Sequence, residues 1–133
     1  GALENKTAGV VRGNISNAPH LSQSLVYSAF SDTNYVGEKK KKFNLLKKRF
    51  KEVAKILKEH KEYSEEFTAL PFNSGYFMCV KLNKDAENVR QILLDKYDTG
   101  VIALGNLLRI AFSSTPTGTL GELFENIYKA CKE

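Results

Sequence analysis

The stretch TGVIALGNLLRIAFSS, residues 99–114, decides how the rest of the chain is interpreted. It holds two short apolar runs, residues 101–104 and 107–112, which are separated by Gly105 and Asn106. Both of these residues tolerate a positive φ, and such a pair between two β-prone runs is typical of a hairpin turn. We therefore expect two neighbouring strands in this stretch.

One charged side chain, that of Arg109, lies inside the second apolar run. Side chains alternate along a strand, so Arg109 is expected on the face opposite to Leu108 and Ile110. Burying a charge without compensation costs several kcal/mol or more. Arg109 therefore either meets a carboxylate of the fold or awaits an anionic ligand, and the residue types leave both interpretations open.

The composition suits one globular domain over residues 1–133, because 42% of the residues are hydrophobic and 11% are aromatic. No apolar run approaches the ~20 residues of a membrane-spanning helix, and the chain does not begin with a signal segment. We therefore expect a cytoplasmic protein with no membrane partner. Because the first residue is Gly1 rather than Met, we also expect a piece of a longer protein.

The strongest helical pattern covers residues 36–63, where lysines surround an apolar stripe. The stripe recurs at steps of three and four residues and consists of Phe43, Leu46, Phe50, Val53 and Leu57. The lysines contribute much of the net charge of +5, which is compatible with binding to nucleic acid or to a membrane surface. A nucleic-acid site needs outward aromatic or arginine side chains, whereas both phenylalanines here belong to the stripe. The pattern therefore favours a solvated helix face.

An earlier helix is expected to begin near Ser16 or Asn17, with Pro19 in its first turn, and to end near Phe30. A turn at residues 12–14 is expected to precede this helix, and a polar break at residues 31–34 to follow it. The side chains expected to face inward from it are Leu21, Leu25, Val26 and Ala29.

Towards the C-terminus, a loop at residues 70–75 leads into residues 76–82, a strand rich in β-formers. A helix capped by Asn83 or Asp85 then runs to about residue 97, and Gly100 is expected to be its left-handed C-terminal residue.

The last helix begins either at Thr115, with proline in its first turn, or at Thr119, with Glu122 completing a capping box. The full order is helix, long helix, strand, helix, strand, strand, helix. This order predicts an α+β fold, a two-layer α/β sandwich in which helices cover one face of a small mixed or antiparallel sheet.

Catalytic and metal-binding motifs are missing from the sequence. Cys79 and Cys131 lack the spacing of a zinc site and are expected to be buried free thiols. The two histidines have no nucleophile nearby in sequence, and the glycines form no phosphate-binding loop. Two arginines remain as candidate anion receptors, Arg12 and Arg109, because the planar fork of arginine can hold a carboxylate by two parallel hydrogen bonds. A structural ion pair stays open for each.

Three segments together resemble the C-terminal part of class I/II aminotransferases, the fold-type I enzymes that depend on pyridoxal phosphate. They are VVRGNISNAPHLSQSL (residues 10–25), NSGYFMCVKL (residues 73–82) and GVIALGNLLRIAFSS (residues 100–114). The last is the most specific, because it joins a turn of small residues to an apolar strand with one arginine. The resemblance spans nearly the whole chain, and the first segment resembles the aspartate aminotransferase pattern, in which an arginine is followed four and five residues later by serine and asparagine.

This resemblance implies substrate-binding roles for both arginines. Arg109 would bind the α-carboxylate of the amino acid, and Arg12 would reach the neighbouring subunit's active site and bind the substrate's distal carboxylate. Ser16 and Asn17 would lie near the cofactor, with the serine beside its phosphate. Asn14 and Ile15 depart from the aspartate aminotransferase pattern.

The resemblance also implies that the chain is the small domain alone, without catalytic residues. The family's cofactor-binding lysine belongs to the large domain, which would precede this chain. We therefore expect no pyridoxal phosphate on the isolated chain and no activity from it. In a homodimeric enzyme, it would serve amino-group transfer between an amino acid and a 2-oxo acid, and a distal carboxylate held by Arg12 would select dicarboxylic amino acids.

Two other functions remain as alternatives. Residues 76–132 resemble the ferredoxin-like layout of RNA-recognition domains, and the chain is basic, but the paired aromatic residues of such domains are not found in a matching motif. A domain that only binds other proteins is the third possibility.

Overall fold

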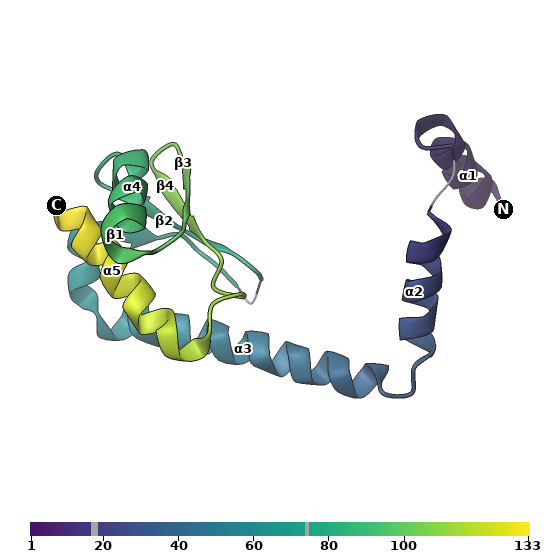
Figure 1. Ribbon diagram of the computed structural model, residues 1–133, viewed down its shortest axis with the longest axis horizontal. Helices are drawn as coiled ribbons and strands as arrows, with labels where there is room; N and C mark the ends of the chain where they lie inside the picture. Colours follow the sequence, from purple (N-terminus) through teal and green to yellow (C-terminus); the bar gives the residue numbers. More distant parts are fainter. Residues whose placement is uncertain (17–18, 74) are drawn as a thin grey trace. The chain divides into compact units, whose positions relative to one another are not determined.

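The computed structural model describes residues 1–16, 19–73 and 75–133 (Figure 1). By its internal contacts the chain divides into two units, residues 1–40 and 41–133. Each unit is described by itself. The hypothesis that the whole chain is one small domain of a longer protein stays a prediction.

The first unit contains α1 (Ala2–Asn14), α2 (His20–Ser31) and the beginning of α3. The turn expected at residues 12–14 is wrong, because α1 continues through Gly13 to Asn14. Glycine lowers helix propensity without forbidding a helix. The second helix begins at His20, with Pro19 before its first turn, while the expected cap at Asn17 lies outside the described residues.

The side chains expected to face inward from α2 are exposed instead. Leu21 is 71% exposed and Leu25 is 63% exposed, and Val26 and Ala29 are exposed as well. Neither α1 nor α2 contains a buried residue. The apolar pattern is present in α2, but none of its side chains is buried among the described residues.

The long helix α3 (Tyr35–Glu59) confirms the lysine-rich helical pattern, although it ends four residues before the expected limit. A short 3-10 helix, η1 (Lys61–Glu65), follows it. In the stripe, Val53 is buried and Phe50 is half-buried, whereas Phe43 is 58% exposed. Although α3 has 25 residues, no helix among the described residues is both long and apolar enough to cross a membrane.

The sheet contains β1 (Phe67–Ala69), β2 (Met78–Leu82), β3 (Ile102–Leu104) and β4 (Leu107–Ile110), in the order β1-β2-β4-β3. All neighbouring strands are antiparallel. The expected hairpin between β3 and β4 is confirmed, and Gly105 has the positive φ of 61° that its turn requires. The sequence did not predict β1, because three residues are too few to show an alternating pattern.

The helix after β2 is α4 (Ala86–Tyr97), and its predicted cap is confirmed because the Asp85 carboxylate accepts a hydrogen bond from Asn88 N at 2.9 Å. The prediction for Gly100 is wrong. Asp98 adopts the left-handed conformation at the end of α4, with a φ of 45°. Aspartate reaches this region more readily than most residues.

The last helix, α5 (Leu120–Lys132), follows the short 3-10 helix η2 (Thr117–Thr119). Thr119 is therefore the residue before the helix, as one of the two alternatives predicted. Its hydroxyl group donates to the Pro116 carbonyl instead of capping α5, so the expected capping box is not formed.

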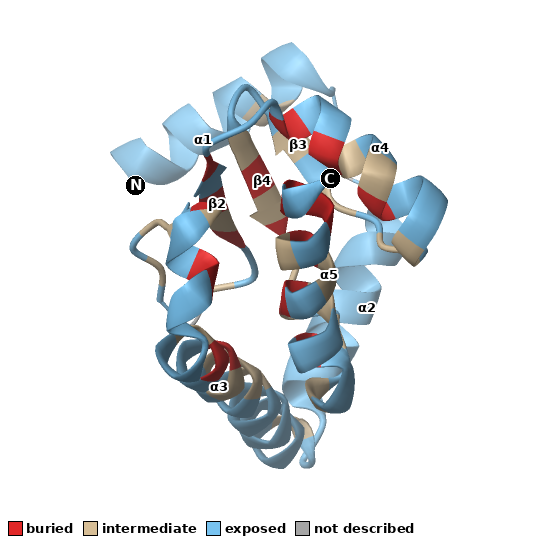
Figure 2. Cartoon of the chain, turned by 90° about the vertical axis from the view of Figure 1, so that its left-hand side faces the viewer, coloured by how far each residue is buried: buried red, intermediate tan, exposed pale blue. Residues whose placement is uncertain are grey.

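The core lies between one face of the sheet and the helices α4, α5 and the second half of α3 (Figure 2). Its largest fully buried side chains are Phe112, Phe124, Leu93, Leu108, Ile110, Leu120 and Ile127. This arrangement confirms the predicted two-layer α+β fold, with an antiparallel sheet. The other face of the sheet is not part of the core.

Replacing Phe124 by alanine is expected to lower the free energy of unfolding by about 3–5 kcal/mol, because it leaves a cavity in the fully buried centre of the core. Urea unfolding followed by circular dichroism measures this change. Leu104→Ala is the control, since Leu104 is 50% exposed and its truncation should cost less than about 1 kcal/mol. Equal losses for the two variants would contradict this description of the core.

Candidate functional site

Arg109 lies in β4 on the sheet face that the helices leave open. Its register partners are Cys79 on β2 and Ile102 on β3, so it occupies the middle of three strands. Its neighbours Leu108 and Ile110 point into the core and are 0% and 1% exposed. Arg109 itself is half-buried. The alternation expected from the sequence is confirmed.

The guanidinium group of Arg109 has no carboxylate partner within residues 1–16, 19–73 and 75–133. Instead, its Cζ atom lies 4.7 Å from the centre of the Phe77 ring, immediately before β2. Such a cation–π contact contributes about 0.5–2 kcal/mol and leaves the N–H groups at the edge of the guanidinium free for other partners. Of the two interpretations that the sequence left open, an ion pair with a carboxylate of the fold is not found among the described residues.

The surface around Arg109 is largely apolar, although Lys81 on β2 lies on the same face. On the same face of β3, Ile102 is 46% exposed and Leu104 is 50% exposed, and Phe77 is 51% exposed. Beside them, an open cavity of about 520 Å³ is lined by residues 70–73 and 77–79. A partner that covered this surface would exclude water from Arg109, and a lower local dielectric strengthens the attraction between a guanidinium and a carboxylate.

Phe77 was not singled out from the sequence as a partner of Arg109. The available signal was an aromatic residue at the beginning of an expected strand, but strand pairing and register were needed to bring it to Arg109. The two side chains are 32 positions apart in the chain, and only the antiparallel pairing of β2 with β4 makes them neighbours.

Arg12 and Ser16 come together in the first unit. Arg12 lies in the last turn of α1, and its Nη1 atom donates a hydrogen bond to Ser16 Oγ at 2.8 Å. Ser16 has a positive φ of 64°. Like Arg109, Arg12 has no carboxylate partner in the described part of the chain.

The predicted site residues therefore fall into two groups. The structure brings Arg12 to Ser16 in the first unit and places Arg109 in the second unit. Asn17, the fourth predicted site residue, lies outside the described residues.

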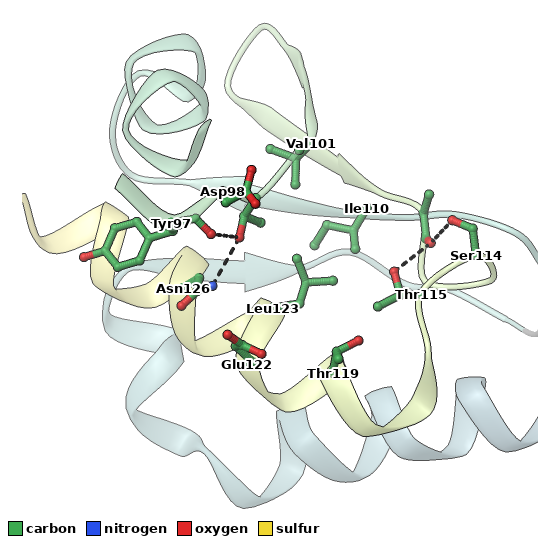
Figure 3. A pocket seen from close by; sticks show the side chains of 13 residues that line it. Tyr97, Asp98, Val101, Ile110, Ser114, Thr115, Thr119, Glu122, Leu123 and Asn126 are labelled. Carbon is green, nitrogen blue, oxygen red and sulfur yellow. Dashed lines mark hydrogen bonds between the residues drawn. The ribbon is translucent and has the colours of Figure 1, made fainter. Parts of the chain in front are cut away.

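A second cavity, of about 400 Å³, lies between α5, the segment after α4 and the end of β4 (Figure 3). Thr99 Oγ1 donates to the Tyr97 carbonyl at 2.8 Å and accepts a hydrogen bond from Asn126 Nδ2 at 3.1 Å. Ile110 contributes to its lining and Arg109 does not. These hydrogen bonds connect α5 to the segment between α4 and β3, which is a structural role.

The resolved pKa shifts belong to contacts of the helices and of η1. The Glu87 carboxylate accepts hydrogen bonds from Arg90, which lower its pKa to about 2. Hydrogen bonds from Lys96 and Tyr97 lower the pKa of Glu133 and connect α4 to the end of α5. None of the shifts resolved among the described residues lies on β2, β3 or β4.

Solved structures with a fold similar to that of this chain include two aminotransferases. A crystal structure of an aminotransferase from Anaerococcus prevotii DSM 20548 matches 99% of this chain with a TM-score of 0.73 and 20% sequence identity, over 31% of its own length. An aromatic aminotransferase from Pyrococcus horikoshii OT3 matches 91% of this chain with a TM-score of 0.61 and 14% identity, over 34% of its own length.

No protein-family model and no curated protein sequence matches the chain significantly. The chain spans about a third of the length of each solved structure that it resembles. At these identities the likeness concerns the fold. The likeness confirms the aminotransferase-like fold that the sequence motifs implied, because the chain is folded like about a third of an aminotransferase.

The two free cysteines are expected to differ in reactivity. Burial raises the pKa of the Cys131 thiol to about 11, whereas Cys79 is half-buried on the open sheet face. Because the thiolate is the reactive form, a soluble disulfide reagent at pH 8 should modify Cys131 at least about tenfold more slowly than Cys79. The Cys79→Ser and Cys131→Ser variants each keep one of the two thiols, so their labelling rates show which cysteine reacts faster. Faster modification of Cys131 would contradict the observed burial.

Proposed function

We propose that this chain is the small domain of a pyridoxal-phosphate-dependent aminotransferase and that Arg109 binds the α-carboxylate of the substrate. The observation that carries the proposal is that the guanidinium of Arg109, on an open and largely apolar sheet face, has no carboxylate partner among the described residues. The likeness of the fold to aminotransferases supports it. The reaction would move an amino group between an amino acid and a 2-oxo acid.

The geometry around Arg109 suits the recognition of a carboxylate. The Phe77 ring covers one face of the guanidinium, so the N–H groups at its edge can form two parallel hydrogen bonds to a carboxylate. A guanidinium held by a ring in this way loses less conformational entropy when the substrate binds. In the intact enzyme, the large domain would cover the open face, and the small domain would move as a lid when substrate arrives.

A second carboxylate would be bound by Arg12 in the partner subunit's active site of a homodimer. Arg12 is exposed and already oriented by its hydrogen bond to Ser16. In this proposal Ser16 lies near the cofactor phosphate, and Asn17 lies beside it. A guanidinium at the distal end of the substrate would favour dicarboxylic amino acids over neutral ones.

The residues of this chain do not by themselves suit the covalent attachment of pyridoxal phosphate. A lysine that forms a Schiff base needs an ammonium group whose pKa is lowered by burial, and every lysine of the chain is exposed. When bound to the intact enzyme, the cofactor would supply the electron sink for the reaction. We therefore assign the cofactor to the large domain and expect the isolated chain to be inactive.

The partners proposed for the chain are thus the large domain, a second subunit, and the amino-acid and 2-oxo-acid substrates. A cytoplasmic location, without membrane or nucleic-acid partners, belongs to the same proposal.

The nucleic-acid alternative is not favoured by the sheet. RNA-recognition domains stack bases on aromatic side chains of their two central strands. The central strands β2 and β4 present Cys79, Lys81, Leu107 and Arg109 on the open face.

Substituting Arg109 by leucine in the longer enzyme should remove the contact to the α-carboxylate. Loss of such a buried, charged hydrogen-bond pair costs about 2–5 kcal/mol, so kcat/KM should fall about 30- to 5,000-fold. Steady-state transamination rates measure the effect. The matched control is Arg90→Leu, because Arg90 lies on α4 and pairs with Glu87. An unchanged kcat/KM for the Arg109 variant would exclude the proposed role.

Reversing the charge of Arg12 in Arg12→Asp tests its role in substrate selection. The ratio of kcat/KM for aspartate to that for a cationic amino acid should fall by about tenfold or more, because the distal group would now meet a like charge. Lys6→Asp, an identical change of charge on the same exposed helix, is the control. If both variants keep the original ratio, Arg12 does not select the substrate.

A further inference from the structure

Arg49 connects α3 to the segment that follows β4. It is half-buried, and its Nη1 atom donates a hydrogen bond to the carbonyl oxygen of Ser113. Its Nε atom is buried and has no hydrogen-bond partner in the part of the chain that the structure describes. Nothing in the local sequence pattern distinguishes Arg49 from the surrounding lysines.

The contact with Ser113 continues to the strand that lies beside β4. Ser113 N donates to the carbonyl oxygen of Tyr76 at 3.3 Å. Two residues further, Met78 pairs with Ile110 in the regular ladder of β2 and β4. Phe77 lies between these two points, so its backbone is held on both sides.

Phe77 in turn determines the orientation of Arg109, because its ring lies under the guanidinium at 4.7 Å. Three successive contacts therefore connect α3 to the anion-binding group of the sheet. Phe50, the residue after Arg49, also connects α3 to the region around Phe77. Phe50 packs edge-to-face on Phe72, with ring centres 5.3 Å apart, and Phe72 lines the cavity beside Phe77.

From these contacts we propose that Arg49 is a positioning residue for Arg109. By holding the carbonyl of Ser113, Arg49 keeps the ends of β2 and β4 together, and so keeps the Phe77 ring beneath the guanidinium of Arg109. The inference rests on the proposed function only for the identity of the anion that Arg109 binds. The positioning itself is a property of this chain.

The unpaired Nε atom argues against a role in stability alone. A buried N–H group without a partner is destabilising. An apolar side chain of similar length would fill the same space without this penalty, as often holds when buried charges are replaced by apolar groups. What an apolar side chain lacks is a donor to the Ser113 carbonyl, so the specific contribution of Arg49 is the hydrogen bond.

Nuclear magnetic resonance of the 133-residue chain can test this proposal without enzyme activity. The Phe77 ring current should shift the resonances of the δ-methylene and Nε–H protons of Arg109 upfield. The Phe77→Leu variant gives the chemical shifts of the same protons without the ring current. Arg49→Met removes the donor but keeps an apolar stem, and it should lose most of the upfield shift. Arg49→Lys keeps one cationic donor and should retain most of it. Arg90→Met, on α4, is the matched control and should leave the shift unchanged.

The outcomes distinguish a positioning role of Arg49 from a role in packing alone. An upfield shift that persists in Arg49→Met would overturn the proposal, as would equal losses in the methionine and lysine variants. If Arg49→Met does not fold, the lysine variant decides: a folded Arg49→Lys chain that has lost the shift contradicts the role of the hydrogen bond, and one that keeps it supports that role.

The same substitutions in the longer enzyme separate this inference from the proposed function. Arg49→Met should raise KM for the amino acid more than it lowers kcat, because it disturbs the orientation of a binding group. If the proposed function fails, Arg109→Leu has no effect on kcat/KM, yet the magnetic resonance result for Arg49 stands. If only the positioning role fails, Arg109→Leu remains damaging while the Arg109 proton shifts of Arg49→Met match those of the unsubstituted chain.

Discussion

The antiparallel pairing of β2 with β4 is the constraint on which the core and the candidate site both depend. Val80 faces Leu108 and Met78 faces Ile110 on the helix side, where all four side chains are buried. On the other side, the same register brings Cys79 opposite Arg109. A shift of one residue in β4 would turn the charge of Arg109 into the core and the apolar side chains of this strand outwards. Packing of the core therefore also determines where the arginine lies.

Two apolar surfaces of the chain lack a partner among the described residues. One is the open sheet face around Arg109, and the other consists of the exposed apolar residues of α1 and α2. Exposed apolar patches of this kind commonly mark contacts with other proteins or domains. Both agree with a chain that functions as part of a larger assembly. The lysines of α3 provide solubility on the face that points away from the core.

Local sequence patterns were sufficient for most of the elements of the second unit. The apolar repeat of α3, the cap at Asp85 and the hairpin at Gly105 each depend on neighbouring residues only, and each is confirmed. Predictions of burial failed where a neighbouring element decides the outcome. The side chains of α2 that were expected to face inward are exposed. The left-handed position after α4 is a local misprediction, because Asp98 rather than Gly100 adopts it.

The sequence by itself determined that a lone arginine would lie on an apolar strand, opposite to the core side chains, because alternation along a strand is a local property. It left open whether a carboxylate of the fold would neutralise Arg109, since that depends on residues distant in the chain. Only the tertiary structure decided that Phe77 is the partner of this guanidinium and that Arg49 holds the strand ends around it. The reason is physical: strand register and helix packing bring together side chains whose separation along the chain carries no information about contact.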